Sequence, residues 1–363
     1  SLGYQVGPLP SGFAILMLWA VGGLIALTGA LTYAEIATTL KRSGGEYLYL
    51  STIIHPALGF VAGWMSMLVG FAGAISAVAL AIGEYSFALI PFDSTITAVL
   101  AILIVTTIHW FGVRTGGMAQ TILTTLKISL ILFFCIAPFF VTHTSLSGIS
   151  FWPQVSDVSL ITSAGFAISL VYVIYAYTGW NAAAYIAGNL ENPVKNLPRS
   201  LIVGTLLVIV IYLFLNGMFL YSASFAELEG QNDVGNVVAF KLFGSSAGAL
   251  FAALFSIALL STLSAMTIAG PRVFEAMGED YPAMKSFARK NQYDMPYLAI
   301  VAQGGWAIFL VLVSSFKEII QYISISLSIF SMLTVLSIFL LRQKYPTGER
   351  PFKVPLYPLP PII

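Results

Sequence analysis

The chain has 363 residues, of which 9% are charged, against about 25% in soluble globular domains. Hydrophobic residues make up 58% of it and the mean hydropathy is +0.91, which leaves too little polar surface for a water-soluble fold. The net charge of +1 offers no basic field for nucleic acid, and the single Cys135 excludes an internal disulfide. The composition therefore indicates a membrane protein that crosses the bilayer several times.

Long apolar runs, divided by charges, glycine and proline, predict nine membrane-spanning segments in one transmembrane domain over residues 1–363. Helices are expected because a lipid-exposed backbone must satisfy its own hydrogen bonds across a core about 30 Å thick. The alternating pattern of a membrane barrel is absent, so the predicted fold class is all-α. The segments cover about residues 11–39, 57–89, 94–111, 118–141, 161–187, 200–222, 245–269, 297–314 and 318–342.

Lysine and arginine are divided unequally between alternate loops of this arrangement. One set of loops holds thirteen of them, whereas the other set holds only Lys241 and Lys317. Because short cytoplasmic loops are enriched in these residues, we expect Ser1 outside and Ile363 in the cytoplasm of a cell-membrane protein. An outside start predicts one more span before Ser1, so we interpret the chain as a fragment. The thirteen are Lys41, Arg42, Arg114, Lys195, Arg199, Arg272, Lys285, Arg289, Lys290, Arg342, Lys344, Arg350 and Lys353.

Several kinds of chemistry lack their sequence signals. No GxxxxGK[ST] phosphate loop occurs, and all five aspartates are placed in loops, with none expected to be buried. His55, His109 and His143 fall on separate loops or span ends, so they predict no metal site. We therefore expect no enzyme and no cofactor. Transport driven by a gradient, or a binding scaffold, remains.

Lys127 is the ionisable residue placed deepest in a predicted span, about 13 Å from its start at Met118. Gln120, Thr124 and Lys127 follow each other at helical spacing, so they form a polar stripe that must face protein or a cavity. Lys127 is interpreted either as a functional charge or as a structural lysine bonded to helix-end carbonyls. Glu35 and Glu84 lie nearer span ends, where pairing of Glu35 with Lys41 and an interfacial position for Glu84 are expected.

Two further segments are candidates for function. Tyr175 to Asn181 places a glycine among aromatic residues inside the fifth predicted span, which indicates either a broken helix that can bind a charged group or an ordinary membrane glycine. Hydroxyl residues recur in the seventh span, where close helix packing and ion coordination are the two interpretations. They are Ser256, Ser261, Thr262, Ser264 and Thr267.

In these and other motifs the chain resembles bacterial amino acid permeases of the amino acid, polyamine and organocation transporter superfamily. The matches follow the family's order along nearly the whole chain, and as a series they are highly specific. They comprise Trp19 to Tyr47, Gly112 to Arg114 with Lys127, Tyr175 to Asn181, Asn192-Pro193 with Asn196 to Arg199, Gly270 to Arg272, and Arg350 to Phe352.

The resemblance implies a fold of two inverted five-helix repeats, in which the visible spans correspond to helices 2 to 10. The family's first helix, which receives the substrate carboxylate, would precede Ser1, and further helices would follow Ile363. In the implied substrate site, Tyr175 is an aromatic gate, Ala176, Tyr177 and Gly179 are unwound backbone facing the amino group, and Asn181 is a polar pocket residue. Asn189 departs from the glutamate expected there.

The resemblance also implies an ion-coupling site. Lys127 matches a lysine that, in proton-linked members, stands where sodium-linked members hold an ion, beside Ser261, Thr262 and Ser264. We therefore predict a secondary transporter of neutral L-amino acids, acting as a proton symporter. The alternatives are an amino acid exchanger without ion coupling and a nontransporting receptor or scaffold. The expected partners are the amino acid and the lipid bilayer, with no nucleic acid and no obligatory protein partner.

Overall fold

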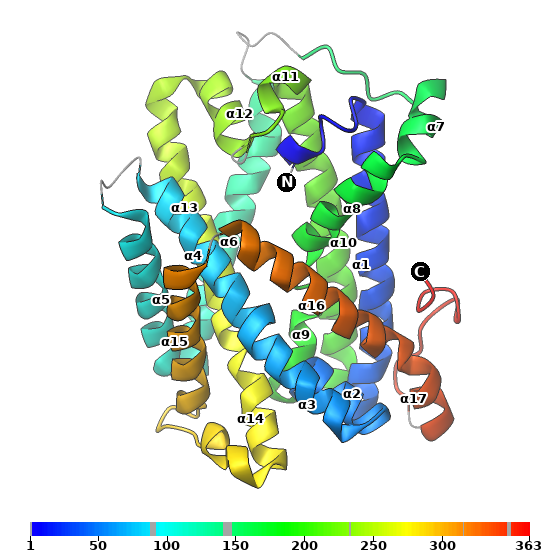
Figure 1. Ribbon diagram of the computed structural model, residues 1–363, viewed down its shortest axis with the longest axis vertical. Helices are drawn as coiled ribbons and strands as arrows, with labels where there is room; N and C mark the ends of the chain where they lie inside the picture. Colours follow the sequence, from blue (N-terminus) through cyan, green and yellow to red (C-terminus); the bar gives the residue numbers. More distant parts are fainter. Residues whose placement is uncertain (1, 88–91, 141–146, 232–233, 315, 347–349) are drawn as a thin grey trace. The chain divides into compact units, whose positions relative to one another are not determined.

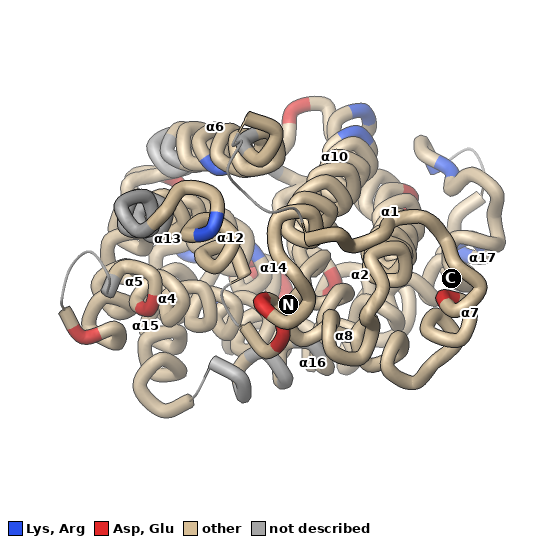
Figure 2. The backbone as a smooth tube through the Cα atoms, turned by 90° about the horizontal axis from the view of Figure 1, so that it is seen from above, with Lys and Arg blue, Asp and Glu red and all other residues tan. Residues whose placement is uncertain are grey.

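The computed structural model describes residues 2–87, 92–140, 147–231, 234–314, 316–346 and 350–363 (Figure 1). That part of the chain folds into helices joined by turns and contains no β-strand, which confirms the all-α prediction. Charged residues are sparse along the trace in Figure 2, as the composition requires. His143 lies outside the described residues, and so do the side chains of Arg114, Asn189 and Lys317.

Among the described residues, five helical stretches are long and apolar enough to cross a membrane, or six if a bent pair counts as one span. The bent pair is α7 (Val155–Ile161) and α8 (Ala164–Tyr177), which meet at 66°. The five stretches are Gly12–Leu40, Pro56–Ser86, Pro193–Ser222, Leu254–Asp280 and Ile325–Lys344. They contain or overlap α1 (Gly12–Leu40), α3 (Pro56–Met65), the π-helical Ser66–Phe71, α4 (Ala72–Phe87), α10 (Pro193–Ser222), α13 (Ser245–Ala269), α14 (Pro271–Asp280), α16 (Phe316–Leu336) and α17 (Ile338–Lys344).

The other three predicted spans are also helical but shorter in their apolar parts. They are α5 (Ser94–Trp110), α6 (Val113–Ile136) and α15 (Tyr297–Val313). Four further helices occupy regions that the sequence placed outside the spans or at their ends. They are α2 (Gly45–Ile53), α9 (Ala182–Tyr185), α11 (Phe225–Leu228) and α12 (Val234–Phe243).

Polar side chains define where several helices begin. Asp93 precedes α5, and its carboxylate accepts hydrogen bonds from the Thr95 and Ile96 amides at 2.8 and 3.1 Å. Asp157 stands in the first turn of α7, where it accepts from the Gln154 amide at 2.7 Å and from the Ser11 hydroxyl at 2.6 Å. Asp157 is only 3% exposed, so the expectation that no aspartate is buried is wrong. Its burial is offset by these hydrogen bonds.

The helices group into two compact units. Unit 1 comprises Ser1–Leu27, Leu126–Thr178 and Gly204–Leu254, and unit 2 comprises Thr28–Thr125, Gly179–Val203 and Phe255–Ile363. Every boundary between the units falls inside or next to a helix, so the sequence carries no linker at these points. A single transmembrane domain over residues 1–363 stays a prediction.

Small residues allow close helix packing within unit 2. Helices α4, α5 and α15 lie side by side (Figure 1), with Ala79, Ala98 and Ala307 fully buried among them. The Ser76 hydroxyl donates to the Ala307 carbonyl at 2.9 Å and to its own helix at Ala72. Because hydrocarbon supplies no hydrophobic drive for helices to associate, small side chains and such interhelical hydrogen bonds are what hold membrane helices together.

Unit 1 is built around an aromatic cluster. Trp19 of α1 packs edge-on against Tyr212 of α10 with ring centroids 5.2 Å apart, and Tyr177 of α8 approaches the same tyrosine at 5.1 Å. The Trp19 indole donates to the Gln5 side chain at 2.9 Å, so its one polar atom is satisfied inside the core. The carboxyl end of α8 is therefore anchored by large rings on two other helices.

Candidate functional site

The predicted span from residue 161 to 187 is interrupted in the structure. Helix α8 ends at Tyr177, and the Thr178 hydroxyl turns back to donate to the Tyr175 carbonyl at 2.7 Å. Gly179 then adopts φ +95°, a left-handed conformation, and helix resumes as α9 at Ala182. Of the two interpretations of Tyr175 to Asn181, the broken helix is confirmed. Such a break frees backbone carbonyl and amide groups that would be hydrogen-bonded to each other in a continuous helix.

Glycine is required at position 179 by the backbone conformation and not by a lack of space for a side chain. A Cβ atom there would meet only the Met266 methyl, at 3.6 Å, an ordinary contact distance. We expect Gly179→Ala to destabilise the protein by about 1–2 kcal/mol, because an L-residue is strained at positive φ. Gly204→Ala is the matched control: Gly204 lies inside α10, and apart from the backbone of its own helix turn no atom lies within 4 Å of its Cβ position. That change should be neutral or stabilising.

The comparison requires both variants in detergent, with thermal unfolding followed by tryptophan fluorescence. Equal midpoints for Gly179→Ala and Gly204→Ala would contradict a conformational requirement at the break. A lower midpoint for Gly179→Ala alone would support it.

The part of the predicted site that belongs to unit 1 is firmly anchored. Tyr177 is 4% exposed, and its hydroxyl donates to the Trp19 carbonyl at 3.1 Å. The Ala176 carbonyl accepts from the Tyr212 hydroxyl at 3.0 Å, so this backbone oxygen already has a donor. Tyr175 is half-buried. The role of Tyr175 as an aromatic gate stays a prediction.

The part that belongs to unit 2 carries a carboxyl group that sequence analysis did not single out. Asn181 is buried, and its amide donates to Glu46 Oε1 of α2 at 3.2 Å. The Trp180 ring packs edge-on against Tyr33 of α1 with centroids 4.8 Å apart and fills the space beside Gly29. A signal for Glu46 exists in the sequence: it is the single charged residue between Gly45 and Ile53, a segment otherwise aromatic, aliphatic or hydroxylic.

The hydroxyl residues of α13 contact two different partners within unit 2. Ser261 lies 3.2 Å from the Thr124 hydroxyl of α6, which accepts in turn from the Gln120 amide at 3.0 Å. Ser264 lies 2.9 Å from His109 Nε2 of α5, and both are buried. The predicted stripe of Gln120 and Thr124 therefore faces protein. Thr262 is half-buried.

Lys127 continues that stripe along α6, and its side chain is half-buried. It belongs to unit 1, whereas Ser261, Thr262 and Ser264 belong to unit 2, so their joint site stays a prediction. A cavity of about 320 Å³ within unit 1 has an apolar lining that includes Leu16, Phe151 and Phe214. None of the predicted site residues lines it. Among the described residues, no three His, Cys, Asp or Glu side chains form a candidate metal site.

Glu35 is the centre of a buried ion cluster in unit 2. Its carboxylate accepts from Arg342 at 2.6 and 2.9 Å, from Arg350 at 2.5 Å and from the Val354 amide at 2.7 Å. Lys41, the partner expected from the sequence, is exposed, so that expectation is wrong. Both arginines come from the far end of the chain and reach back to α1.

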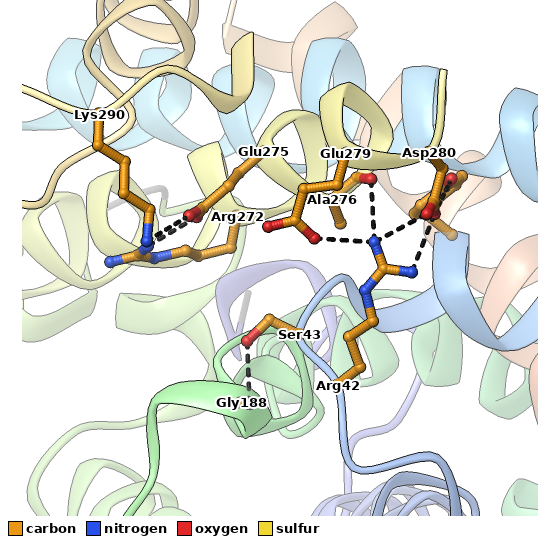
Figure 3. A network of polar contacts seen from close by, with 10 residues as sticks. Arg42, Ser43, Gly188, Arg272, Glu275, Ala276, Glu279, Asp280 and Lys290 are labelled. Atoms are coloured by element: carbon orange, nitrogen blue, oxygen red, sulfur yellow. Dashed lines mark hydrogen bonds and ion pairs between the residues drawn. The ribbon is translucent and has the colours of Figure 1, made fainter. Parts of the chain in front are cut away.

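A second ionic network joins the polar ends of α1 and α14 (Figure 3). Arg42 reaches between Glu279 and Asp280 at 2.8 and 2.9 Å, and the Tyr47 hydroxyl donates to Asp280 at 2.6 Å. Beside it, Glu275 pairs with Arg272 at 2.6 Å and with Lys290 at 3.2 Å. The Gly188 amide donates to Ser43 at 2.9 Å, which ties the loop after α1 to the segment that follows the break. Cations that the sequence placed on one side of the membrane thus pair with carboxylates here and at Glu35.

Comparison with known proteins adds independent information. A family model described as "Amino acid permease" matches residues 4–363. The serine/threonine exchanger SteT of Bacillus subtilis is 29% identical over 361 residues, which cover 96% of this chain and 80% of the relative. The b(0,+)-type amino acid transporter 1 of Mus musculus is 28% identical, covering 94% and 71%. The human cystine/glutamate transporter is 27% identical, covering 94% and 69%.

Proposed function

Because the chain belongs to the amino acid permease family, whose model matches residues 4–363, we propose that it exchanges small neutral amino acids across the cell membrane. Membership of this family establishes that the chain is a multi-pass membrane protein that transports amino acids. The members of the family are transporters and not enzymes. The observation that carries exchange is the match to SteT, a relative named as a serine/threonine exchanger, over 96% of the chain. The resemblance noted from the motifs is thereby confirmed.

The charge of the candidate site supports a neutral substrate. From Tyr175 to Asn181 the chain has no charged residue, and the carboxyl group bonded to Asn181 is itself held by three donors. A charged substrate side chain buried there without a partner would cost several kcal/mol. We therefore propose that the backbone around Gly179 receives the amino group and that Asn181 lines the pocket. The role of Tyr175 as an aromatic gate is proposed from the family resemblance alone.

Proton-coupled symport is the second candidate function. Lys127, a half-buried cation on the apolar helix α6, is the observation that favours it. The name of the SteT relative favours exchange, in which the loaded carrier reorients and no ion gradient is needed. Exchange is therefore the function that we propose first. Lys127 then acts as a fixed charge between the helices.

We also propose the arrangement that the family implies. The described spans take the places of helices 2 to 10 in two inverted five-helix repeats, with Ser1 outside and Ile363 in the cytoplasm of the cell. The unequal distribution of lysine and arginine between alternate loops supports this orientation. Cysteine substitutions at Lys285 and at Ser150, labelled from one side of intact cells, would test it.

Exchange is tested by counterflow in proteoliposomes that contain the full-length protein. We expect labelled serine to enter about tenfold faster when the lumen holds unlabelled serine than when it is empty, and replacing sodium by choline should change nothing. Alanine and leucine should compete, whereas arginine and glutamate should not. Uptake into empty vesicles that follows an imposed proton gradient would instead support symport. Vesicles without protein are the blank.

A further inference from the structure

Glu46 is a buried carboxyl group of unit 2 whose two oxygens have unlike surroundings. Oε1 accepts three hydrogen bonds, from the Tyr33 hydroxyl at 2.8 Å, the Ser331 hydroxyl at 2.7 Å and the Asn181 amide at 3.2 Å. Oε2 is also buried and has no hydrogen-bond partner among the described residues. None of the ion pairs found in that part of the chain involves Glu46. The group is therefore held by neutral donors alone.

The titratable groups that face Glu46 are phenols. They belong to Tyr33 of α1, Tyr49 of α2 and Tyr185 of α9. Helix α16 contributes the neutral Ser331, and on α14 the carboxylate of Asp280 is turned to Arg42 and Tyr47. Two other buried carboxylates of unit 2, Glu35 and Glu275, are each paired with two cations of their own. Within the described part of the chain, no ion pair balances a charge on Glu46.

This environment favours the neutral acid over the carboxylate. Burial raises the pKa of Glu46, and the hydrogen bonds from Ser331 and Tyr33 oppose that rise only in part. As an acid, Glu46 has one O–H group, which has the Tyr185 phenol among its neighbours and at worst remains an unpaired hydroxyl. As a carboxylate, it would leave an unbalanced charge in the interior, which costs far more than an unpaired hydroxyl.

We propose that Glu46 is a positioning residue for substrate binding: as a neutral acid it binds the Asn181 amide only weakly and leaves it available to the substrate, and on losing its proton it holds that amide more tightly. Four elements meet at this carboxyl group: α1, α2, α16 and the segment that follows the break. Ionisation strengthens the three hydrogen bonds donated to Oε1 and draws water or a cation toward Oε2. The proton on Glu46 thus sets the affinity for the amino acid. This inference rests on the proposed exchange function with Asn181 in its site.

The test compares wild type, Glu46→Gln and Glu84→Gln in counterflow assays with equal pH on both sides of the membrane. The amide oxygen introduced by Glu46→Gln can accept the same three hydrogen bonds, but the amide cannot ionise. We expect the apparent KM of wild type to rise about tenfold between about pH 5 and about pH 9 with little change in maximal rate, while Glu46→Gln keeps the low-pH KM throughout. Glu84, an exposed carboxyl on α4, is the control, and its variant should follow wild type.

A wild-type KM that does not change over this pH range, or a Glu46→Gln profile that matches wild type, would overturn the proposal. Thermal unfolding supplies a readout that does not depend on transport. Because the folded-state pKa is raised, the stability from Glu46 is present at low pH and lost as pH rises through that value. The melting temperature of wild type should therefore fall relative to Glu46→Gln as pH rises. If wild type shows this fall but no counterflow, the exchange function fails and the proton site stands.

Discussion

Replacing Glu35 by glutamine is expected to lower the free energy of unfolding by about 3–5 kcal/mol, the usual cost of breaking a buried ion pair from one side. The substitution keeps the volume of the side chain but removes the charge that two guanidinium groups share. Arg350 is 8% exposed and Arg342 is 19% exposed at their side chains, so neither can be fully hydrated in place. Two like charges would then face each other beside α1 without a carboxylate between them.

Thermal and denaturant unfolding in detergent would measure this loss, with Glu84→Gln as the matched control. Glu84 is exposed, so its change should fall within about 0.5 kcal/mol of wild type. Adding Arg342→Gln to Glu35→Gln should recover part of the stability, because one of the two unbalanced charges is then gone. If Glu35→Gln and Glu84→Gln have the same free energy of unfolding, the ion cluster around Glu35 does not hold the segment around Arg350 against α1.

Local sequence patterns predicted the features that depend on local physics. Apolar runs located the helices because each must cover the hydrocarbon with its own side chains and satisfy its own backbone. The glycine among aromatic residues located the break, since Gly179 adopts a backbone conformation that other residues resist. The stripe of Gln120 and Thr124 was found by helical spacing, and both side chains do reach a neighbouring helix.

Pairings between distant residues could not be predicted in this way. Glu35 meets Arg342 and Arg350 across more than 300 residues, and no local pattern distinguishes them from the nearer Lys41. Glu46 falls between the first two predicted spans, 11–39 and 57–89, so the sequence pattern leaves it outside the membrane helices. Its burial becomes evident only when Asn181 and Ser331 are brought to it by the fold. The local signal for a buried Glu46 is that it is a charged residue in a short segment rich in tyrosine.

Lys127→Ala is expected to reduce amino acid counterflow by about tenfold or more while the protein still folds and inserts. Lys127 follows Gln120 by two helical turns, about 10 Å along α6, at the end of the polar stripe of a helix that is apolar beyond it. A cation kept at such a position costs stability, so its removal should not destabilise the helix. Lys127 contributes instead the electrostatic field of its charge, which acts on the groups that reorient during transport. The loss should appear in the maximal rate at every pH.

Lys241→Ala is the matched control, because Lys241 pairs with the exposed Glu227 outside the long spans, where an ion pair contributes about 0–1 kcal/mol. That variant should exchange like wild type. The pH profile then separates the roles of the two groups: Glu46→Gln removes the dependence of the KM on pH and keeps the maximal rate, whereas Lys127→Ala lowers the maximal rate at every pH. Wild-type uptake into empty vesicles driven by a proton gradient, and abolished by Lys127→Ala, would make Lys127 the coupling group of a symporter. Normal counterflow in Lys127→Ala would leave the lysine a structural role alone.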